Sequence, residues 1–454
     1  MALHTGIGHF LPLVAYLVGL GVAVVGALGR PEWALYLYTF MLPLQTSRYK
    51  LHAYPLGTHY IDIILLGCVV GLWVKEGSIF AKTPINGLLL FYAFFLFLSL
   101  IRGAFFLNDW SLSVSYQRLA YWKCYIEMPF VALVAARIIK NEAQVKRLLL
   151  FMCLSMVYVG RDFASSNRGH HLAASFVQTH RSASALGYAG VNGMAAFEAM
   201  ITIFLLTIYF VEKRLSVKLG LLFVMAVNTY CLLFSFSRGG WLGFAAGLFA
   251  LGVLKYRKLL VLLAVVVIGW QVVLPRSVQQ RIEMTDQRTT TGRKLDTSGE
   301  ERLELWRNAL ISFEQRPIIG SGFDTYGFTY HEGLYRDTHN YYMKALVETG
   351  IVGLVIFCWL FARMTFLGYA LFWRAEDPFW KAVGLGFTVA MAATLVVNMF
   401  GDRWTYQQLD GYLWILLAFV FRGLIVTKEA AATQPETAPA MTPVLAGTMH
   451  PATS

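Results

Sequence analysis

The sequence predicts an all-α polytopic integral membrane protein, and three observations lead to this fold class. Of the 454 residues, 57% are hydrophobic and only 14% are charged, whereas soluble domains carry about 25% charged residues. Apolar runs long enough to cross about 30 Å of hydrocarbon recur along the chain. Because backbone amides in lipid must be hydrogen-bonded internally, these runs are expected to be helices.

The apolar runs give about 13 expected spans, or about 12 if an early run is short or re-entrant. The first has no Lys or Arg before it and is followed by Arg30, so it does not resemble a cleaved signal peptide. The five cysteines are scattered without metal-binding spacing, and neither a metal nor a cofactor is expected. The spans lie near 10–28, 33–45, 60–74, 86–101, 121–138, 146–160, 188–211, 218–235, 239–254, 258–274, 342–372, 380–400 and 409–427.

Alternate connections carry Lys and Arg, which predicts that they lie on the cytoplasmic side of the membrane. The remaining connections then face the outside. Two of these stand out: 161–187 is rich in Arg and His, and 275–341 is far longer than an ordinary loop. Their cations either dissolve in water or bind an anion such as a lipid-linked phosphate. The basic connections are 74–82, 137–148, 212–218, 255–258, 373–381 and the tail from Arg422.

The expected organisation has four parts. Residues 1–274 hold transmembrane helices one to ten, and 275–341 form a large periplasmic loop. Residues 342–427 hold the last transmembrane helices, and 428–454 form a disordered cytoplasmic tail rich in Ala, Thr and Pro.

One helix is predicted inside the long loop, at 299–316. Ser298 and Glu301 have the spacing of a capping box at its start, and Pro317 ends it before the glycine turn "IIGSGF". We expect this helix to fold over the membrane part as a lid on an outward-facing cavity. Its apolar face is made by Leu303, Trp306, Leu310 and Phe313.

Three arginines are candidates for anion binding. Arg238 stands in the short glycine-rich turn "SRGGWLG" between two expected spans. A guanidinium fixed there suits a membrane-anchored pyrophosphate, although an arginine that reaches from the interface into water would have the same sequence pattern. Arg302 and Arg307 project about 140° apart on the loop helix, so both cannot reach one site. We expect Arg302 to bind; Arg307 is solvated, paired or a secondary substrate contact.

His339 is expected in the first turn of a helix, after Asp337 and Thr338, which are interpreted as capping residues. The positive end of the helix dipole disfavours an imidazolium, and a neutral ring can accept a proton from a hydroxyl as a general base. A histidine at an interfacial helix start can equally be structural. Glu348 lies about 13 Å further along the helix and about half a turn away, which argues against a dyad with His339.

Three blocks in this order resemble the O-antigen ligase and O-antigen polymerase superfamily: "SRGGWLG", "ERLELWRNAL" with "RPIIGSGF", and "HNYYMKALVETGIVGL". The resemblance covers 235–357, with a weaker similarity at 187–198. It implies a C-type glycosyltransferase-like architecture with a large periplasmic loop. It also implies transfer of a glycan from undecaprenyl pyrophosphate to an acceptor.

The resemblance assigns roles to residues that match its blocks. Arg238 matches the arginine of the Ser-Arg-Gly block, Arg302 that of the Arg-x-x-x-Trp block, and His339 the histidine of the His-Asn block. The arginines are thereby implied to hold the donor pyrophosphate, and the histidine to activate the acceptor hydroxyl. Arg181, before "GYAGVN", is a further donor-binding candidate, and Asn340 a substrate-binding one.

Within the superfamily, the preferred interpretation is a ligase that joins a finished glycan to lipid A–core oligosaccharide. A polymerase that lengthens a lipid-linked glycan and an enzyme that attaches glycans to proteins stay open. The expected partners are the undecaprenyl-pyrophosphate-linked donor, the lipid A–core acceptor and membrane lipids, and no nucleic acid. Guanidiniums can stabilise the departing pyrophosphate without a metal, and attack opposite it inverts the anomeric centre.

A transporter is the alternative from another functional class. Transporters place polar or charged residues near the middle of the bilayer and break helices in matching halves. Here the mid-membrane candidates are few, namely Glu127, Glu198 and Glu348, and the cations gather at the outer face instead. This pattern favours the enzyme.

Overall fold

The structure is a computed structural model, which describes residues 11–44, 50–108, 117–178, 181–284, 286–289, 292–295, 297–328 and 337–433. Within these ranges the regular elements are helices, apart from one two-stranded hairpin, so the predicted all-α fold class is confirmed. Among the described residues, nine helices are long and apolar enough to cross a membrane, and three shorter helices are also apolar.

The α-helices are α1 (Leu11–Ala27), α2 (Pro31–Met41), α3 (Tyr60–Glu76), α4 (Asn86–Leu107), α5 (Gln117–Ile138), α6 (Glu142–Ser166), α7 (Gly190–Val211), α8 (Leu215–Phe234), α9 (Arg238–Leu254), α10 (Lys258–Ile268), α11 (Trp270–Val273), α12 (Arg276–Glu283), α13 (Thr297–Gln315), α14 (Tyr341–Arg374), α15 (Pro378–Val397) and α16 (Gln407–Thr433). The short 3-10 helices are η2 (Leu51–Ala53), η3 (Gly57–His59), η5 (Ser184–Ala189), η6 (Tyr326–Phe328) and η7 (Asn398–Phe400). The antiparallel hairpin joins β1 (Asp286–Thr289) to β2 (Gly292–Leu295).

Two predicted spans are shorter than a membrane crossing. The run at 33–45 forms α2, whose 11 residues extend about 16 Å at 1.5 Å per residue. Helix α2 is therefore the short early segment that would reduce the expected number of spans from about 13 to about 12. The run at 258–274 is divided at Gly269 into α10, of 11 residues, and α11, of four. At the other end of the chain, α16 continues to Thr433, beyond the predicted helix end at 427, and residues 434–454 lie outside the described part.

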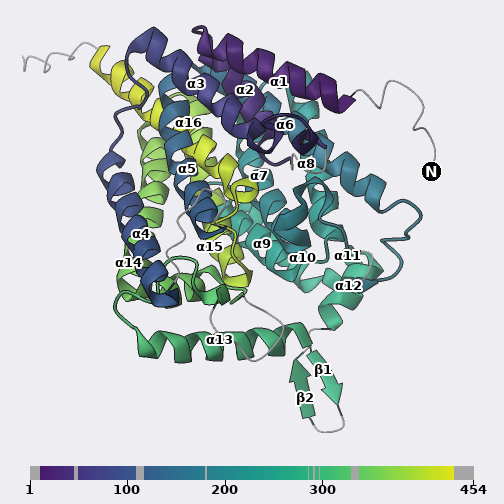
Figure 1. Cartoon of the computed structure of the whole chain (residues 1–454). Helices are drawn as coiled ribbons and strands as arrows, with labels where there is room; N and C mark the ends of the chain where they lie inside the picture. Colours follow the sequence, from purple (N-terminus) through teal and green to yellow (C-terminus); the bar gives the residue numbers. More distant parts are fainter. Residues whose placement is uncertain are drawn as a thin grey trace, which may run out of the picture.

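The basic connections gather at one end of the molecule, as the predicted topology requires. Arg137 and Lys140 both pair with Glu76, at 2.7 Å and 2.9 Å, which joins the α5–α6 connection to the end of α3. The ammonium of Lys146 lies 4.9 Å from the ring centre of Phe379 at the start of α15. In Figure 1 this end lies opposite α13.

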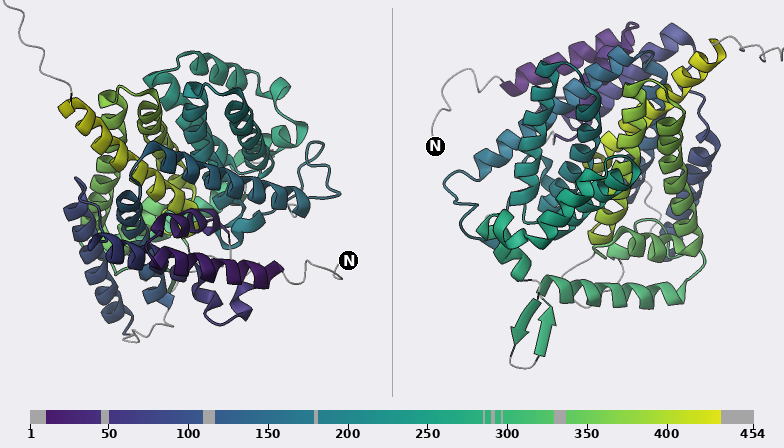
Figure 2. Two further views of the ribbon diagram at one scale, coloured as in Figure 1. Left: turned by 90° about the horizontal axis from the view of Figure 1, so that it is seen from above. Right: turned by 180° about the vertical axis from the view of Figure 1, so that it is seen from behind.

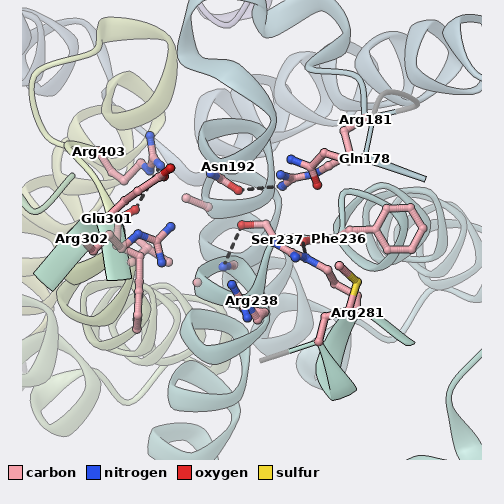
Figure 3. A pocket seen from close by; sticks show the side chains of 16 residues that line it. Gln178, Arg181, Asn192, Phe236, Ser237, Arg238, Arg281, Glu301, Arg302 and Arg403 are labelled. Atoms are coloured by element: carbon pink, nitrogen blue, oxygen red, sulfur yellow. Dashed lines mark hydrogen bonds between the residues drawn. The ribbon is translucent and has the colours of Figure 1, made fainter. Parts of the chain in front are cut away.

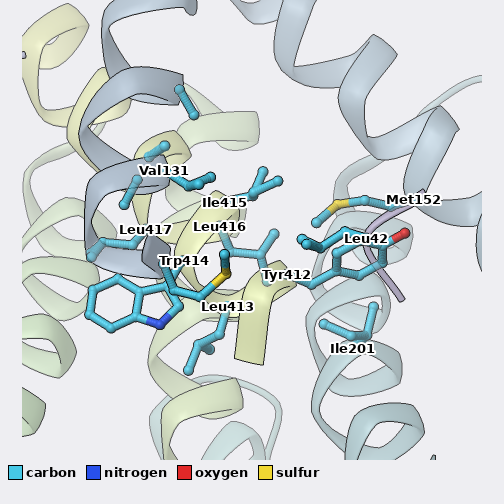
Figure 4. Close-up of a cluster of buried hydrophobic side chains, with 14 of the residues drawn as sticks. Leu42, Val131, Met152, Ile201, Tyr412, Leu413, Trp414, Ile415, Leu416 and Leu417 are labelled. Carbon is cyan, nitrogen blue, oxygen red and sulfur yellow. The ribbon is translucent and has the colours of Figure 1, made fainter. Parts of the chain in front are cut away.

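The core is organised around α16, which is hydrophobic on every side. Its residues Tyr412 to Phe421 are at most 2% exposed, the pattern of a helix surrounded by protein. Figure 4 shows the α16 residues Tyr412 to Leu417 packed among side chains from four other helices or their ends. The surrounding side chains are Leu42, Val131, Met152 and Ile201.

A break in α14 receives the glycine turn that follows α13. Gly350 has φ 66° and ψ −171°, which is not helical. Backbone groups released by a break need new partners where water is scarce. Four hydrogen bonds between the segments 317–322 and 347–352 supply them: Ser321 N–H to Val347 O, Gly322 N–H to Glu348 O, Ile351 N–H to Pro317 O and Val352 N–H to Ile318 O.

Gly350→Ala is expected to destabilise the protein by about 2–5 kcal/mol, because it combines a strained left-handed backbone with a clash. A Cβ at Gly350 would lie 2.2 Å from the carbonyl oxygen of Ile318. Thermal unfolding in detergent measures the effect. The control is Gly220→Ala on α8, where a Cβ meets nothing within 4 Å and alanine favours the helix. Equal unfolding temperatures of the two variants would contradict this account of the break.

Helix α13 crosses the end of the molecule beneath α4 and α14, and the β-hairpin projects beyond it (Figures 1 and 2). Its bounds agree closely with the predicted helix; the side chain of Ser298 lies outside the described part. The predicted apolar face is only partly right. Ala309 is fully buried and packs with Phe313 against α14, whereas Leu303 and Leu310 are each 44% exposed. The small side chain of Ala309 allows close approach, which rotates the two leucines outward.

Candidate active site

Five arginines line a cavity of about 390 Å³ near α13 (Figure 3). They come from segments distant in the sequence, and in the close-up they surround the space from different sides. Among the described residues of the lining, the one acid is Glu301. Such an excess of guanidiniums binds phosphate-bearing groups, because the planar fork pairs with phosphate oxygens through two hydrogen bonds. The five are Arg181, Arg238, Arg281, Arg302 and Arg403.

The start of α9 forms one wall of this arginine cavity. Ser237 caps the helix, its hydroxyl oxygen accepting the N–H of Gly240 at 3.4 Å, and Arg238 is the first helical residue. Phe236, before the cap, has φ 55°, a conformation that costs free energy for a bulky side chain and often marks functional positions. A helix N-terminus favours anions through its N–H groups and its dipole. Arg238 therefore adds its charge to a site already suited to phosphate.

Arg181 is held beside the turn that precedes α9. Its Nε donates to the carbonyl of Ser235 at 2.9 Å, and its Nη2 donates to Oδ1 of Asn192 at 2.8 Å. Burial, together with the charges of three other cavity arginines, lowers the pKa of Arg181 to about 10. The guanidinium stays charged at neutral pH, and the mutual repulsion that lowers its pKa is relieved when an anion enters.

Helix α13 brings Arg302 into the cavity and leaves Arg307 outside it. The guanidinium of Arg302 lies 5.8 Å from the ring centre of Phe400. Arg307 is exposed and lines neither of the two polar cavities at this end. The structure thus brings Arg302 to the cavity and Arg307 to neither cavity; substrate binding by either arginine stays a prediction.

The structure moves His339 out of the helix in which it was expected. Helix α14 begins at Tyr341, and Asn340 is its cap, with Oδ1 accepting the N–H of Tyr342 at 2.9 Å. Asn340 therefore acts through the helix start and lines neither polar cavity. His339 precedes the cap with φ 49°, another strained left-handed position. The cap is Asn340 rather than Asp337 or Thr338, because its carboxamide is the group placed over the first turn.

Asp337 instead holds the imidazole. Its Oδ2 lies 2.9 Å from Nδ1 of His339. Burial opposes ionisation of Asp337, but the hydrogen bond and charge of His339 lower the pKa of that carboxyl to about 2. The carboxylate is therefore ionised at neutral pH and can accept the Nδ1–H, the arrangement of an Asp–His pair in a catalytic triad. Sequence reasoning gave this aspartate a capping role and missed the pair.

One contact relates the segment of the histidine to the rest of the site. Trp306, one turn along α13 from Arg302, donates its Nε1–H to the carbonyl of Thr338 at 3.1 Å. The helix that carries a cavity arginine thus also supports the residue before His339, although His339 itself does not line the arginine cavity. Glu348 forms no dyad with His339, as expected; its carboxylate accepts the N–H of Asp324 at 3.0 Å and of Tyr326 at 3.3 Å.

Comparison with known proteins identifies the segment that carries most of these residues. Residues 220–358 match the O-antigen ligase family. The match confirms the resemblance predicted from the sequence and supports an enzyme of the O-antigen ligase or polymerase type. An uncharacterised protein of Haemophilus influenzae is 25% identical over 189 residues, which cover 36% of this chain and 45% of that protein. The aligned stretch thus spans less than half of either protein.

The O-antigen ligase match contains Arg238, Arg302 and His339, while Arg181 and Arg403 lie outside it. Two cavity arginines were missed by sequence reasoning. Arg281, on α12, is 7% exposed, and its Nε donates to the carbonyl of Phe236 at 3.4 Å. Arg403 lies between α15 and α16, and burial lowers its pKa. The available signal for both was their place in connections expected to face the periplasm: Arg403 in the short connection between the last two spans, and Arg281 in the long loop 275–341.

Proposed function

We propose that this protein is an O-antigen ligase. It transfers a glycan from undecaprenyl pyrophosphate to a hydroxyl of lipid A–core oligosaccharide at the periplasmic face of the bacterial inner membrane. The observation that carries the proposal is the cavity of five arginines around the N-terminus of α9. The O-antigen ligase match and the nine apolar helices of the described part support it.

The proposed reaction uses the arginine cavity and the Asp–His pair together. The pyrophosphate of the donor occupies the cavity, where Arg181, Arg238 and Arg302 neutralise its oxygens. The acceptor hydroxyl gives its proton to Nε2 of His339 while its oxygen attacks the anomeric carbon. The bond from that carbon to the pyrophosphate oxygen breaks, and the negative charge moves into the guanidiniums, where electrostatic stabilisation lowers the barrier. Undecaprenyl pyrophosphate leaves, and the proton passes from His339 to water.

Transfer by the purified protein tests the proposal. Protein in detergent is incubated with undecaprenyl-pyrophosphate-linked glycan and lipid A–core, with and without EDTA, and the products are separated on a gel. Wild type is expected to shift the core band by whole glycan chains in both conditions, and Arg238→Ala and His339→Ala to abolish the shift. A ladder of lipid-linked glycan with unshifted core would instead establish a polymerase. Full activity of both variants would refute the assigned site.

A further inference from the structure

A second cavity, of about 270 Å³, lies on the other side of the connection between α15 and α16. Asp402 of this connection lines the second cavity, and the next residue, Arg403, lines the arginine cavity. The two spaces therefore share a wall at adjacent residues. The second cavity is lined by Tyr121, Asp324, Tyr326, Gly327, Phe328, Asp337, Lys344, Glu348, Asp402, Thr405 and Tyr406. We call it the acidic cavity.

The lining of the acidic cavity has the opposite charge balance to that of the arginine cavity. It contains four carboxyl side chains and one lysine, together with three tyrosines and one phenylalanine. This composition disfavours a phosphate, which the carboxylates repel. It suits an uncharged polyhydroxylated ring: carboxylates and phenols hydrogen-bond to hydroxyl groups, and aromatic side chains supply an apolar surface with a polar tip.

Most polar groups of the acidic cavity are already engaged within the protein. Lys344 pairs with Oδ2 of Asp402 at 3.0 Å, and the carboxylate of Glu348 accepts two backbone N–H groups. Asp324 differs, because among the described residues its buried Oδ2 has no hydrogen-bond partner, an arrangement that is costly unless another group completes it. Burial raises the pKa of Asp324 to about 6, and its backbone has the left-handed φ of 52°.

The acidic cavity also adjoins the proposed base. Asp337 lines the cavity, and the same carboxylate lies 2.9 Å from Nδ1 of His339. A ring bound beside Asp337 therefore lies next to the residue that orients the imidazole. On the far side of the shared wall, the arginine cavity takes the pyrophosphate of the donor.

We propose that the acidic cavity binds the uncharged sugar ring that carries the acceptor hydroxyl, with Asp324 and Tyr406 hydrogen-bonding to its other hydroxyl groups. This inference rests on the proposed function and adds to it a binding site for the acceptor separate from that of the donor. The opposite charges of the two cavities direct the anionic group of the donor to the arginine cavity and repel it from the acidic cavity.

Binding of two probes to the purified protein tests this inference without requiring turnover. The probes are a core oligosaccharide that ends in a neutral hexose, for the acidic cavity, and inorganic pyrophosphate, for the arginine cavity. Asp324→Asn and Tyr406→Phe are each expected to weaken oligosaccharide binding about tenfold, the loss that one hydrogen bond brings. Both variants are expected to leave pyrophosphate binding within about twofold of wild type. Asparagine tolerates the left-handed backbone of position 324, and thermal unfolding checks that both variants fold.

The matched control is Glu304→Gln, which removes an exposed acid of α13 that lines neither polar cavity. It is expected to bind both probes like wild type. Unchanged oligosaccharide binding in Asp324→Asn and Tyr406→Phe would overturn the inference, and so would an equal loss of pyrophosphate binding. If wild type binds the oligosaccharide and both variants weaken that binding, but wild type does not bind pyrophosphate, the acceptor site stands and the proposed donor chemistry fails.

Discussion

Arg302→Ala is expected to lower the rate of glycan transfer by about 100-fold or more, the loss typical when one preorganised charge-stabilising group is removed. Arg302 lines the arginine cavity from α13, and its guanidinium rests against the ring of Phe400. The departing pyrophosphate gains negative charge as its bond to the sugar breaks. The effect should therefore fall mainly on kcat, with a smaller rise in the KM for the donor.

Arg307→Ala is the matched control, because it removes the same side chain from the same helix. Arg307 is exposed and outside both polar cavities, so transfer should stay within about twofold of wild type, as for most surface substitutions. Initial rates at saturating acceptor and varied donor measure both variants. If the two variants lose activity equally, α13 acts through its overall charge rather than through a placed guanidinium.

That Arg302 and Arg307 face different directions could be predicted from the sequence. A helix turns about 100° per residue, so residues five apart must face different directions, and the start and stop signals gave nearly the correct bounds for α13. Polarity and length likewise predicted the membrane fold. These are local properties, which a short stretch of chain determines by itself. The prediction of the apolar face of α13 was only partly right, because the contact of Ala309 with α14 determines how α13 is rotated about its axis.

The rest of the site depends on packing between distant segments. Arg281 and Arg403 reach the cavity only because α12 and the α15–α16 connection converge on the start of α9. The expected periplasmic position of each residue does not reveal this convergence. The acidic cavity is similar, since Tyr121 and Tyr406 are far apart in the chain and meet only in the folded protein. The sequence blocks therefore predicted individual site residues, whereas the opposite charges of the two cavities became apparent only from the folded structure.

His339→Ala is expected to reduce transfer by about 1,000-fold or more, and Asp337→Asn by about 100-fold to 10,000-fold, as for the base and the orienting carboxylate of a triad. The alanine variant removes the proton acceptor. The asparagine variant keeps the shape, but its amide can donate to Nδ1 and so stabilise the tautomer with the proton on Nε2. Single-turnover rates with preloaded donor measure both effects at the chemical step. Equal, small losses in both variants would assign the pair a structural role.

The pH dependence of stability and of transfer rate distinguishes the effect of Asp337 on folding from its effect on the orientation of His339. The pKa of Asp337 is about 2 in the folded protein, below the ordinary value of about 3.9. Folding therefore favours the ionised carboxylate, and its contribution to stability is fully present above about pH 4 and is lost as the pH falls through about 2. Between about pH 5 and 9 Asp337 stays ionised, so changes of activity there arise from other groups. The unfolding temperature of wild type is expected to approach that of Asp337→Asn as the pH falls from about 4 to about 2, while the transfer rates of the two differ throughout the range from about pH 5 to 9. A rate difference that vanished at one end of the range would mean that the carboxylate itself titrates there, and that it shares the proton of the reaction rather than only orienting His339.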